Sequence, residues 1–194
     1  LNIRKDVELT EYIINRAGGK GKITKLFGAL KEFCDDTDFI DFFNSNKDYY
    51  NKIIDDTLYL INDDISIVSQ LEEYYGIKQK SYNVILTSLY GKGAYGPRIQ
   101  TIDGDVEIYS VLGCIGIGVE GYPSFTTYKN FTYLQQHEFS HSFINPITSK
   151  HIELANSYEK LFSPIRDKMK NMAYTSWETC LNEHIIRALT ARFT

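Results

Sequence analysis

Apolar residues recur at helical spacing through residues 1–76, which predicts a mainly helical N-terminal part. The run "DVELTEYIINRAG" shows the pattern and ends at Gly18-Gly19, a common signal for the end of a helix. The last run of this part is expected to stop near Gly76 for the same reason. The predicted helices cover residues 6–18, 23–36, 38–53 and 54–75.

The middle of the chain changes to strand-like sequence. Two stretches rich in β-branched and aromatic residues predict strands: "YNVILTSLY" (82–90) and "DVEIYSVLGCIGIG" (105–118). Gly, Pro and Asp cluster between them and predict turns. Helical spacing then returns, and the predicted helices cover residues 132–144, 150–171 and 177–193, with Pro146 ending the first of them.

Helices, then a small sheet, then helices again make an α+β chain. No repeat or linker-like segment divides it, so a single domain is predicted over residues 1–194. Within it we distinguish the helical part (1–76) from the part with the sheet and the last helices (77–194).

Net charge and the length of the apolar runs exclude some classes of binding partner. The 25 acidic and 21 basic residues give a net charge of -4, and no basic run is long enough to follow a nucleic acid. The longest apolar run, residues 109–119, is too short to cross a bilayer. We therefore expect neither a nucleic-acid partner nor a transmembrane segment.

The stretch "YLQQHEFSHSFINP" carries the strongest chemical signal. His137 and His141 are four residues apart, so a helix places both imidazoles on one face, where they can share a zinc ion. Glu138 is turned about 100° away and can act on water at such an ion without being a third ligand. The order H-E-x-x-H therefore predicts metal-assisted hydrolysis.

A catalytic zinc site needs a third protein ligand from elsewhere. Ile144 and Ile147 stand where a longer histidine motif would continue, and His151 lies too close beyond the predicted helix end. The last helix offers Glu183, near the edge of its apolar side, with Glu178 as the reserve candidate.

The pair "HEFSH" and "LNEH" resembles the gluzincin branch of the zincin metallopeptidases. This resemblance implies a zincin-like fold with a small mixed sheet beside the H-E-x-x-H helix. It also implies zinc held by His137, His141 and Glu183, with Glu138 as general base. The 42 positions from His141 to Glu183 exceed the gap usual in thermolysin-like and aminopeptidase groups, so an extra helix must fill it.

The expected activity is zinc-dependent hydrolysis of a peptide bond in a peptide or protein substrate. In related enzymes a Tyr or His stabilises the oxyanion; here Tyr174, His184 and Arg187 are the candidates, and Arg187 is alternatively a partner of Glu183. The strands "VILTSLYG" and "VEIYSVLG" are candidates for pairing with an extended substrate, with "GAYGP" at the mouth of the cleft.

Two alternatives remain: a binding module that keeps the fold but not the activity, and a helical domain in which the motif is fortuitous. The whole chain is also similar to a bacterial family known as a domain of unknown function. Because the sequence opens on Leu1 rather than methionine, we expect a processed or trimmed chain. With the resemblance, this favours an extracytoplasmic location; the sequence does not indicate an oligomeric state.

Overall fold

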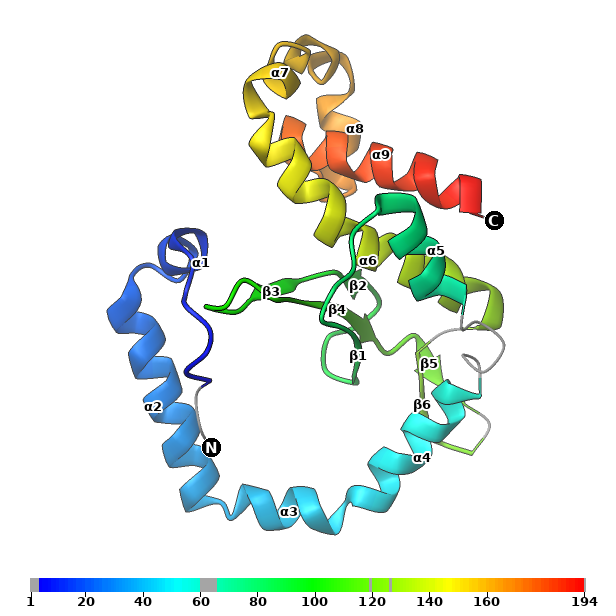
Figure 1. Ribbon diagram of the computed structural model, residues 1–194. Helices are drawn as coiled ribbons and strands as arrows, with labels where there is room; N and C mark the ends of the chain where they lie inside the picture. Colours follow the sequence, from blue (N-terminus) through cyan, green and yellow to red (C-terminus); the bar gives the residue numbers. More distant parts are fainter. Residues whose placement is uncertain (1–3, 60–65, 119, 126, 194) are drawn as a thin grey trace.

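The computed structural model describes residues 4–59, 66–118, 120–125 and 127–193. Helices occupy both ends of the chain and small mixed sheets lie between them, as the α+β prediction requires (Figure 1). The elements are α1 (Glu11–Arg16), α2 (Lys20–Asp36), α3 (Phe39–Ser45), α4 (Lys47–Leu58), α5 (Ser66–Tyr75), β1 (Ser81–Thr87), β2 (Ala94–Tyr95), β3 (Arg98–Gln100), β4 (Val106–Gly113), β5 (Gly116–Ile117), β6 (Pro123–Ser124), α6 (Tyr128–Lys150), α7 (Ile152–Asn156), the 3-10 turns η1 (Glu159–Leu161) and η2 (Ser163–Ile165), α8 (Arg166–Asn171) and α9 (Trp177–Phe193).

The first helix is shorter than predicted because the residues before it join the sheet. Val7 forms a β-bridge with Thr101, so the helix starts only after Thr10, whose hydroxyl accepts from the backbone N–H of Ile13. The predicted boundary between residues 53 and 54 is also wrong, because α4 runs through it. Residues 60–65 of the predicted 54–75 helix lie outside the described residues.

The α5 helix ends as predicted at a glycine. Gly76 has a φ of 67°, a left-handed conformation that glycine adopts without strain, and its N–H bonds the carbonyl of Glu72.

The main sheet is built around β4. The β1 strand pairs with it in parallel along one edge, while β2 and then β3 pair antiparallel along the other. The N–H of Tyr109 bonds the carbonyl of Pro97, between β2 and β3, so these two short strands follow one line beside β4. The second sheet is the β5–β6 hairpin.

The α6 helix does not end before Pro146, contrary to the prediction; it continues to Lys150. Proline has no N–H, so the carbonyl of Ser142, four residues earlier, loses its helical partner. The guanidinium of Arg98 in β3 replaces it, with Nη1 3.2 Å from that carbonyl oxygen. A long-range hydrogen bond thus satisfies the group that the proline leaves unpaired.

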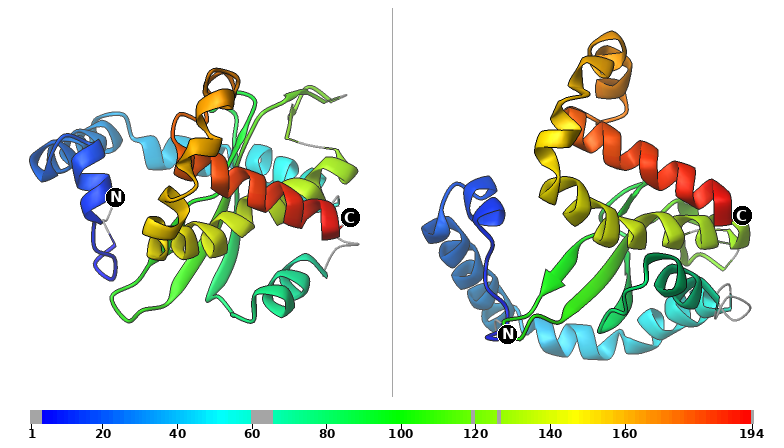
Figure 2. Two further views of the ribbon diagram at one scale, coloured as in Figure 1. Left: turned by 90° about the horizontal axis from the view of Figure 1, so that it is seen from above. Right: turned by 45° about the horizontal axis from the view of Figure 1, so that its top comes forward.

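The predicted 150–171 helix is likewise wrong, since α7, two 3-10 turns and α8 occupy this range. The excursion folds back onto the start of α9: the Trp177 indole donates to the carbonyl of Ala155 (2.7 Å), and its ring packs against buried Phe162. This segment therefore fills the long gap and returns the chain to α6, against which α9 lies (Figure 2).

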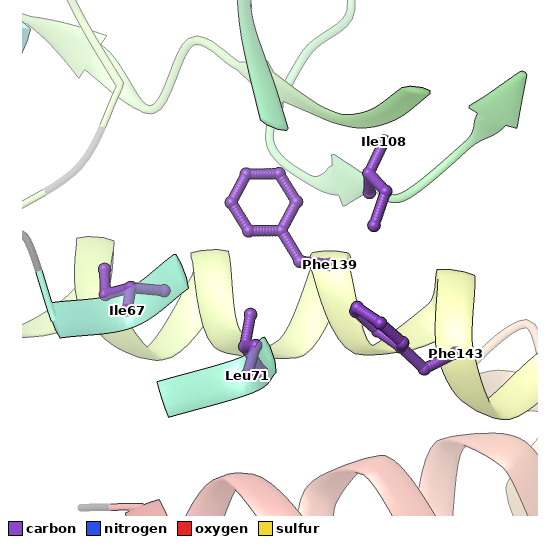
Figure 3. Close-up of a cluster of buried hydrophobic side chains, with 5 residues drawn as sticks. All are labelled: Ile67, Leu71, Ile108, Phe139 and Phe143. Atoms are coloured by element: carbon purple, nitrogen blue, oxygen red, sulfur yellow. The ribbon is translucent and has the colours of Figure 1, made fainter. Parts of the chain in front are cut away.

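The core lies between the sheet and the helices. Ile67 and Leu71 of α5 meet Phe139 and Phe143 of α6 and Ile108 of β4 (Figure 3). The other face of α6 is thus left to meet α9. No helix in the described ranges combines the length and apolar character of a membrane span.

Candidate metal centre

Two histidines of α6 and one glutamate of α9 converge at the site. The Nε2 atoms of His137 and His141 lie 3.4 Å from Oε2 and Oε1 of Glu183, respectively. Two ligands of a tetrahedral ion, each about 2.0 Å from it, are separated by about 3.3 Å. The donor atoms of the three residues all lie within 4.8 Å of one another, so this group can hold one metal ion.

Neighbouring side chains orient the imidazoles. His141 Nδ1 lies 3.3 Å from the amide oxygen of Asn145, which fits an Nδ1–H donor and leaves Nε2, the atom that faces Glu183, free to bind a metal ion. The ring of Tyr133 stacks on His137 at 6.1 Å between centroids. His137 Nδ1 is buried and has no partner within the described part of the chain.

The electrostatics favour a neutral His141 beside a charged Glu183. Burial lowers the pKa of His141. Burial alone would raise the pKa of Glu183, but hydrogen bonds and charges from His137, His141 and Tyr174 outweigh it and lower that pKa. Neutral imidazole and ionised carboxylate are the protonation states that ligate a metal.

Glu138 belongs to the same cleft but not to the ligand group. Burial, with a smaller contribution from the Glu183 charge, raises the pKa of Glu138 to about 7, although His137 opposes the shift. A buried carboxyl group poised near neutral pH suits proton transfer to and from a reacting group.

The cleft in front of these residues has a volume of about 840 Å³. Tyr174 and Arg187, two of the three predicted oxyanion candidates, line it, and Arg187 donates to the Tyr174 hydroxyl (2.7 Å). Arg187 Nε is also 3.9 Å from Glu183, as expected of a partner four residues along the helix. His184, the third candidate, is not among the residues that line the cleft. Its Nδ1 instead lies 2.7 Å from the carbonyl oxygen of Cys180 in the same helix.

The structure separates the third-ligand candidates. Glu183 reaches the histidines, whereas Glu178 accepts a hydrogen bond from Ser149 (2.8 Å) and is outside the ligand group. His151 is exposed between α6 and α7 and is also outside the group.

The strand beside the site differs from both predicted strands. Both edges of β4 are covered, by β1 on one side and by β2 and β3 on the other, so "VEIYSVLG" has no edge for a substrate. The strand at the cleft is β2, of which Ala94 and Tyr95 line the wall, followed by Gly96. A Cβ on Gly96 would lie 2.1 Å from the carbonyl oxygen of Glu138, so only glycine lets this strand approach α6 so closely.

Sequence reasoning missed several residues of the cleft. Asn145 and Tyr133 are four residues from His141 and His137 on one helix, and helical spacing alone contained that signal. Tyr12 and Arg16 of α1 also line the cleft, but nothing local in the sequence places α1 there.

Residues 4–194 match a family described as "Domain of unknown function (DUF4932)". No curated protein and no solved structure matches the chain.

Proposed function

The chain belongs to the DUF4932 family, and from the geometry of its site we propose that it is a zinc-dependent peptidase of the gluzincin type. The observation that carries the proposal is the convergence of His137, His141 and Glu183, with the carboxyl group of Glu138 lining the same cleft. A fortuitous H-E-x-x-H sequence would not require a carboxylate 42 residues later to face both imidazoles.

The ligand set favours zinc. Two imidazole nitrogens and one carboxylate are a set found in catalytic zinc sites, in which three protein ligands leave one position for water or substrate. His137, His141 and Glu183 would hold the ion. When bound, zinc supplies Lewis acidity, which lowers the pKa of water toward about 7 and polarises a carbonyl group.

Glu138 performs the proton transfers in this proposal. Its carboxylate accepts the proton of the attacking water and then delivers it to the leaving amine. The burial that raises its pKa to about 7 makes both steps accessible near neutral pH. Glu138 lies outside the ligand group, so its carboxyl group is free to transfer protons.

Tyr174 is the proposed donor to the developing oxyanion. Its hydroxyl is held by Arg187 at 2.7 Å in the wall of the cleft, so its orientation is fixed before substrate arrives. Arg187 remains charged and so adds positive potential at the same place.

The arrangement of β2 and α6 supports a zincin-like fold. In the described sheet β2 pairs only with β4, so its outer edge is open to an extended peptide. Gly96 packs on the backbone of Glu138. A peptide bound along this edge would therefore lie near the Glu138 carboxyl group, which would carry out the proton transfers.

The proposal is tested with a Glu138→Gln variant and a library of proteome-derived peptides. With zinc, the natural chain is expected to cleave peptides, and Glu138→Gln to bind zinc but cleave about 100-fold or more slowly. A Glu178→Gln variant is the control and should cleave normally, because Glu178 lies outside the ligand group.

Undiminished cleavage by Glu138→Gln, or cleavage that survives removal of metal by a chelator, would contradict the proposal. Zinc binding without any cleavage by the natural chain would instead support the inactive binding module.

A further inference from the structure

The N-terminal segment is anchored on the sheet in a way that brings α1 to the cleft. The Val7–Thr101 bridge is continued by a hydrogen bond from the N–H of Ile102 to the carbonyl of Asp6 (2.9 Å). Arg4 Nη2 donates to Glu107 of β4 at 2.9 Å. These contacts fix the chain just before α1, which lies beyond the end of β3 (Figure 1).

Arg16 of α1 lines the cleft without a carboxylate partner. Its Nη1 donates to the hydroxyl of Tyr12 at 2.8 Å, and no ion pair of Arg16 occurs within the described ranges. This hydrogen bond uses one of the five N–H donors of the guanidinium, so most of its donors remain for a ligand. Arginine presents these donors in a planar fork that matches a carboxylate.

The charge balance of the cleft favours an anionic ligand. Four residues that line it carry formal charge, namely the pair Arg16 and Arg187 and the pair Glu138 and Glu183. Their charges cancel, so a divalent cation at the metal centre leaves the cleft positive. Arg187 is already engaged by Glu183 and Tyr174, which leaves Arg16 as the guanidinium available to substrate.

We propose that Arg16 is a specificity-determining residue that binds a carboxylate of the peptide substrate, and so selects acidic peptides. This inference rests on the proposed peptidase function and assigns its substrate class. In this arrangement the peptide bond to be cleaved lies at the metal centre between α6 and α9, and a carboxylate elsewhere in the peptide binds Arg16 of α1. The carboxylate belongs either to an Asp or Glu side chain or to the peptide C-terminus.

The test measures binding rather than cleavage. Fluorescein-labelled peptides of equal length are titrated with zinc-loaded Glu138→Gln protein, and fluorescence anisotropy is recorded. One peptide carries Glu residues and an amidated C-terminus, the second carries Lys at the same positions and is amidated, and the third is Ala-based with a free C-terminus.

We expect a carboxylate peptide to bind more tightly than the Lys peptide. Adding Arg16→Gln to the protein should weaken its binding about fivefold, the effect of an exposed charge pair, and Arg16→Glu should reverse the preference. The preference should also fall with added salt, because exposed charges are screened over about 8 Å at physiological ionic strength.

Lys25→Gln is the matched control. It removes the same charge from exposed surface of the neighbouring helix α2, outside the cleft, and should leave binding unchanged. If Arg16→Gln weakens binding of the Glu peptide, Arg16 binds an acidic side chain of the substrate. If it weakens binding of the free-terminus peptide alone, Arg16 binds the C-terminal carboxylate. Equal binding of all three peptides, or equal losses in Arg16→Gln and Lys25→Gln, would overturn the proposal.

The two proposals fail in different ways. An Arg16-dependent preference in a protein that cleaves nothing would retain this binding site and remove the peptidase. Zinc-dependent cleavage without any Arg16-dependent preference would remove only the role of Arg16.

Discussion

Asn145 fixes the orientation of one proposed ligand from a position one helical turn away. Its amide oxygen lies 3.3 Å from Nδ1 of His141, which holds the ring with Nε2 toward Glu183. Such outer partners set the tautomer of a metal-binding histidine and increase its basicity. His137 has an aromatic neighbour, Tyr133, in the corresponding place.

We predict that Asn145→Ala weakens zinc binding about 10- to 100-fold, the usual effect of losing an outer partner of a ligand. Isothermal titration with zinc measures the change. Asn156→Ala, the same substitution at an exposed site in α7, is the control and should leave the affinity unaltered. Equal affinities for the Asn145 and Asn156 variants would mean that the amide does not support His141.

Part of the candidate site could be predicted from residue spacing alone. The spacing of His137 and His141 places them on one helix face with Glu138 about 100° away, so local geometry was sufficient for these three residues. The choice between Glu183 and Glu178 was not local, because it depends on how α9 is rotated against α6. The structure excludes Glu178, which accepts a hydrogen bond from Ser149 and lies outside the candidate ligand group.

Among the elements, β2 depends on a single glycine for its place beside α6. At Gly96 the strand approaches the backbone of Glu138 so closely that a Cβ would lie 2.1 Å from its carbonyl oxygen. The strand therefore forms the cleft wall only while this position has no side chain.

We predict that Gly96→Ala destabilises the protein by about 1–3 kcal/mol or more, because α6 or β2 must move to admit the methyl group. Thermal or denaturant unfolding measures the loss. Gly28→Ala in α2 is the matched control: a Cβ there has open space, and alanine should stabilise the helix by about 0.5–1 kcal/mol. A Gly96→Ala protein as stable as the natural chain would show that β2 does not pack on α6 in this way.

Two helix boundaries explain why element predictions failed where they did. Proline normally ends a helix, but Arg98, 48 residues before Pro146, supplies a donor for the carbonyl of Ser142. The prediction at 150–171 failed because the chain bends to bring Phe162 under Trp177. Both outcomes depend on partners distant in sequence, which a local pattern does not contain.

For the whole molecule, the apolar pattern predicted helices better than it predicted their packing. In α2 the described buried residues are Ile23 and Cys34, while Leu26 and Phe33 remain 57% and 52% exposed. The helices α1 to α4 form an arc around the sheet (Figure 1), and within this arc α4 packs on the sheet, where its Ile53 meets Leu112 of β4. Periodicity therefore predicted that this part is helical, but it predicted neither the helix boundaries nor the tertiary contacts.

The candidate metal centre joins α6 and α9 across the α7–α8 excursion. Two of its residues come from one helix and the third comes from the other, so the site exists only when these helices are docked. The proposed peptidase activity and the proposed role of Arg16 both require a metal ion bound by these three residues.

Zinc titration of the metal-free protein, with the bound metal counted by elemental analysis, tests this central claim most directly. We predict one zinc ion per chain and an affinity that Glu183→Ala lowers by more than about 100-fold, beyond the loss expected for an outer partner. Glu178→Ala should bind zinc as the natural chain does. Absence of zinc from the natural chain, or equal affinities for Glu183→Ala and Glu178→Ala, would contradict the account.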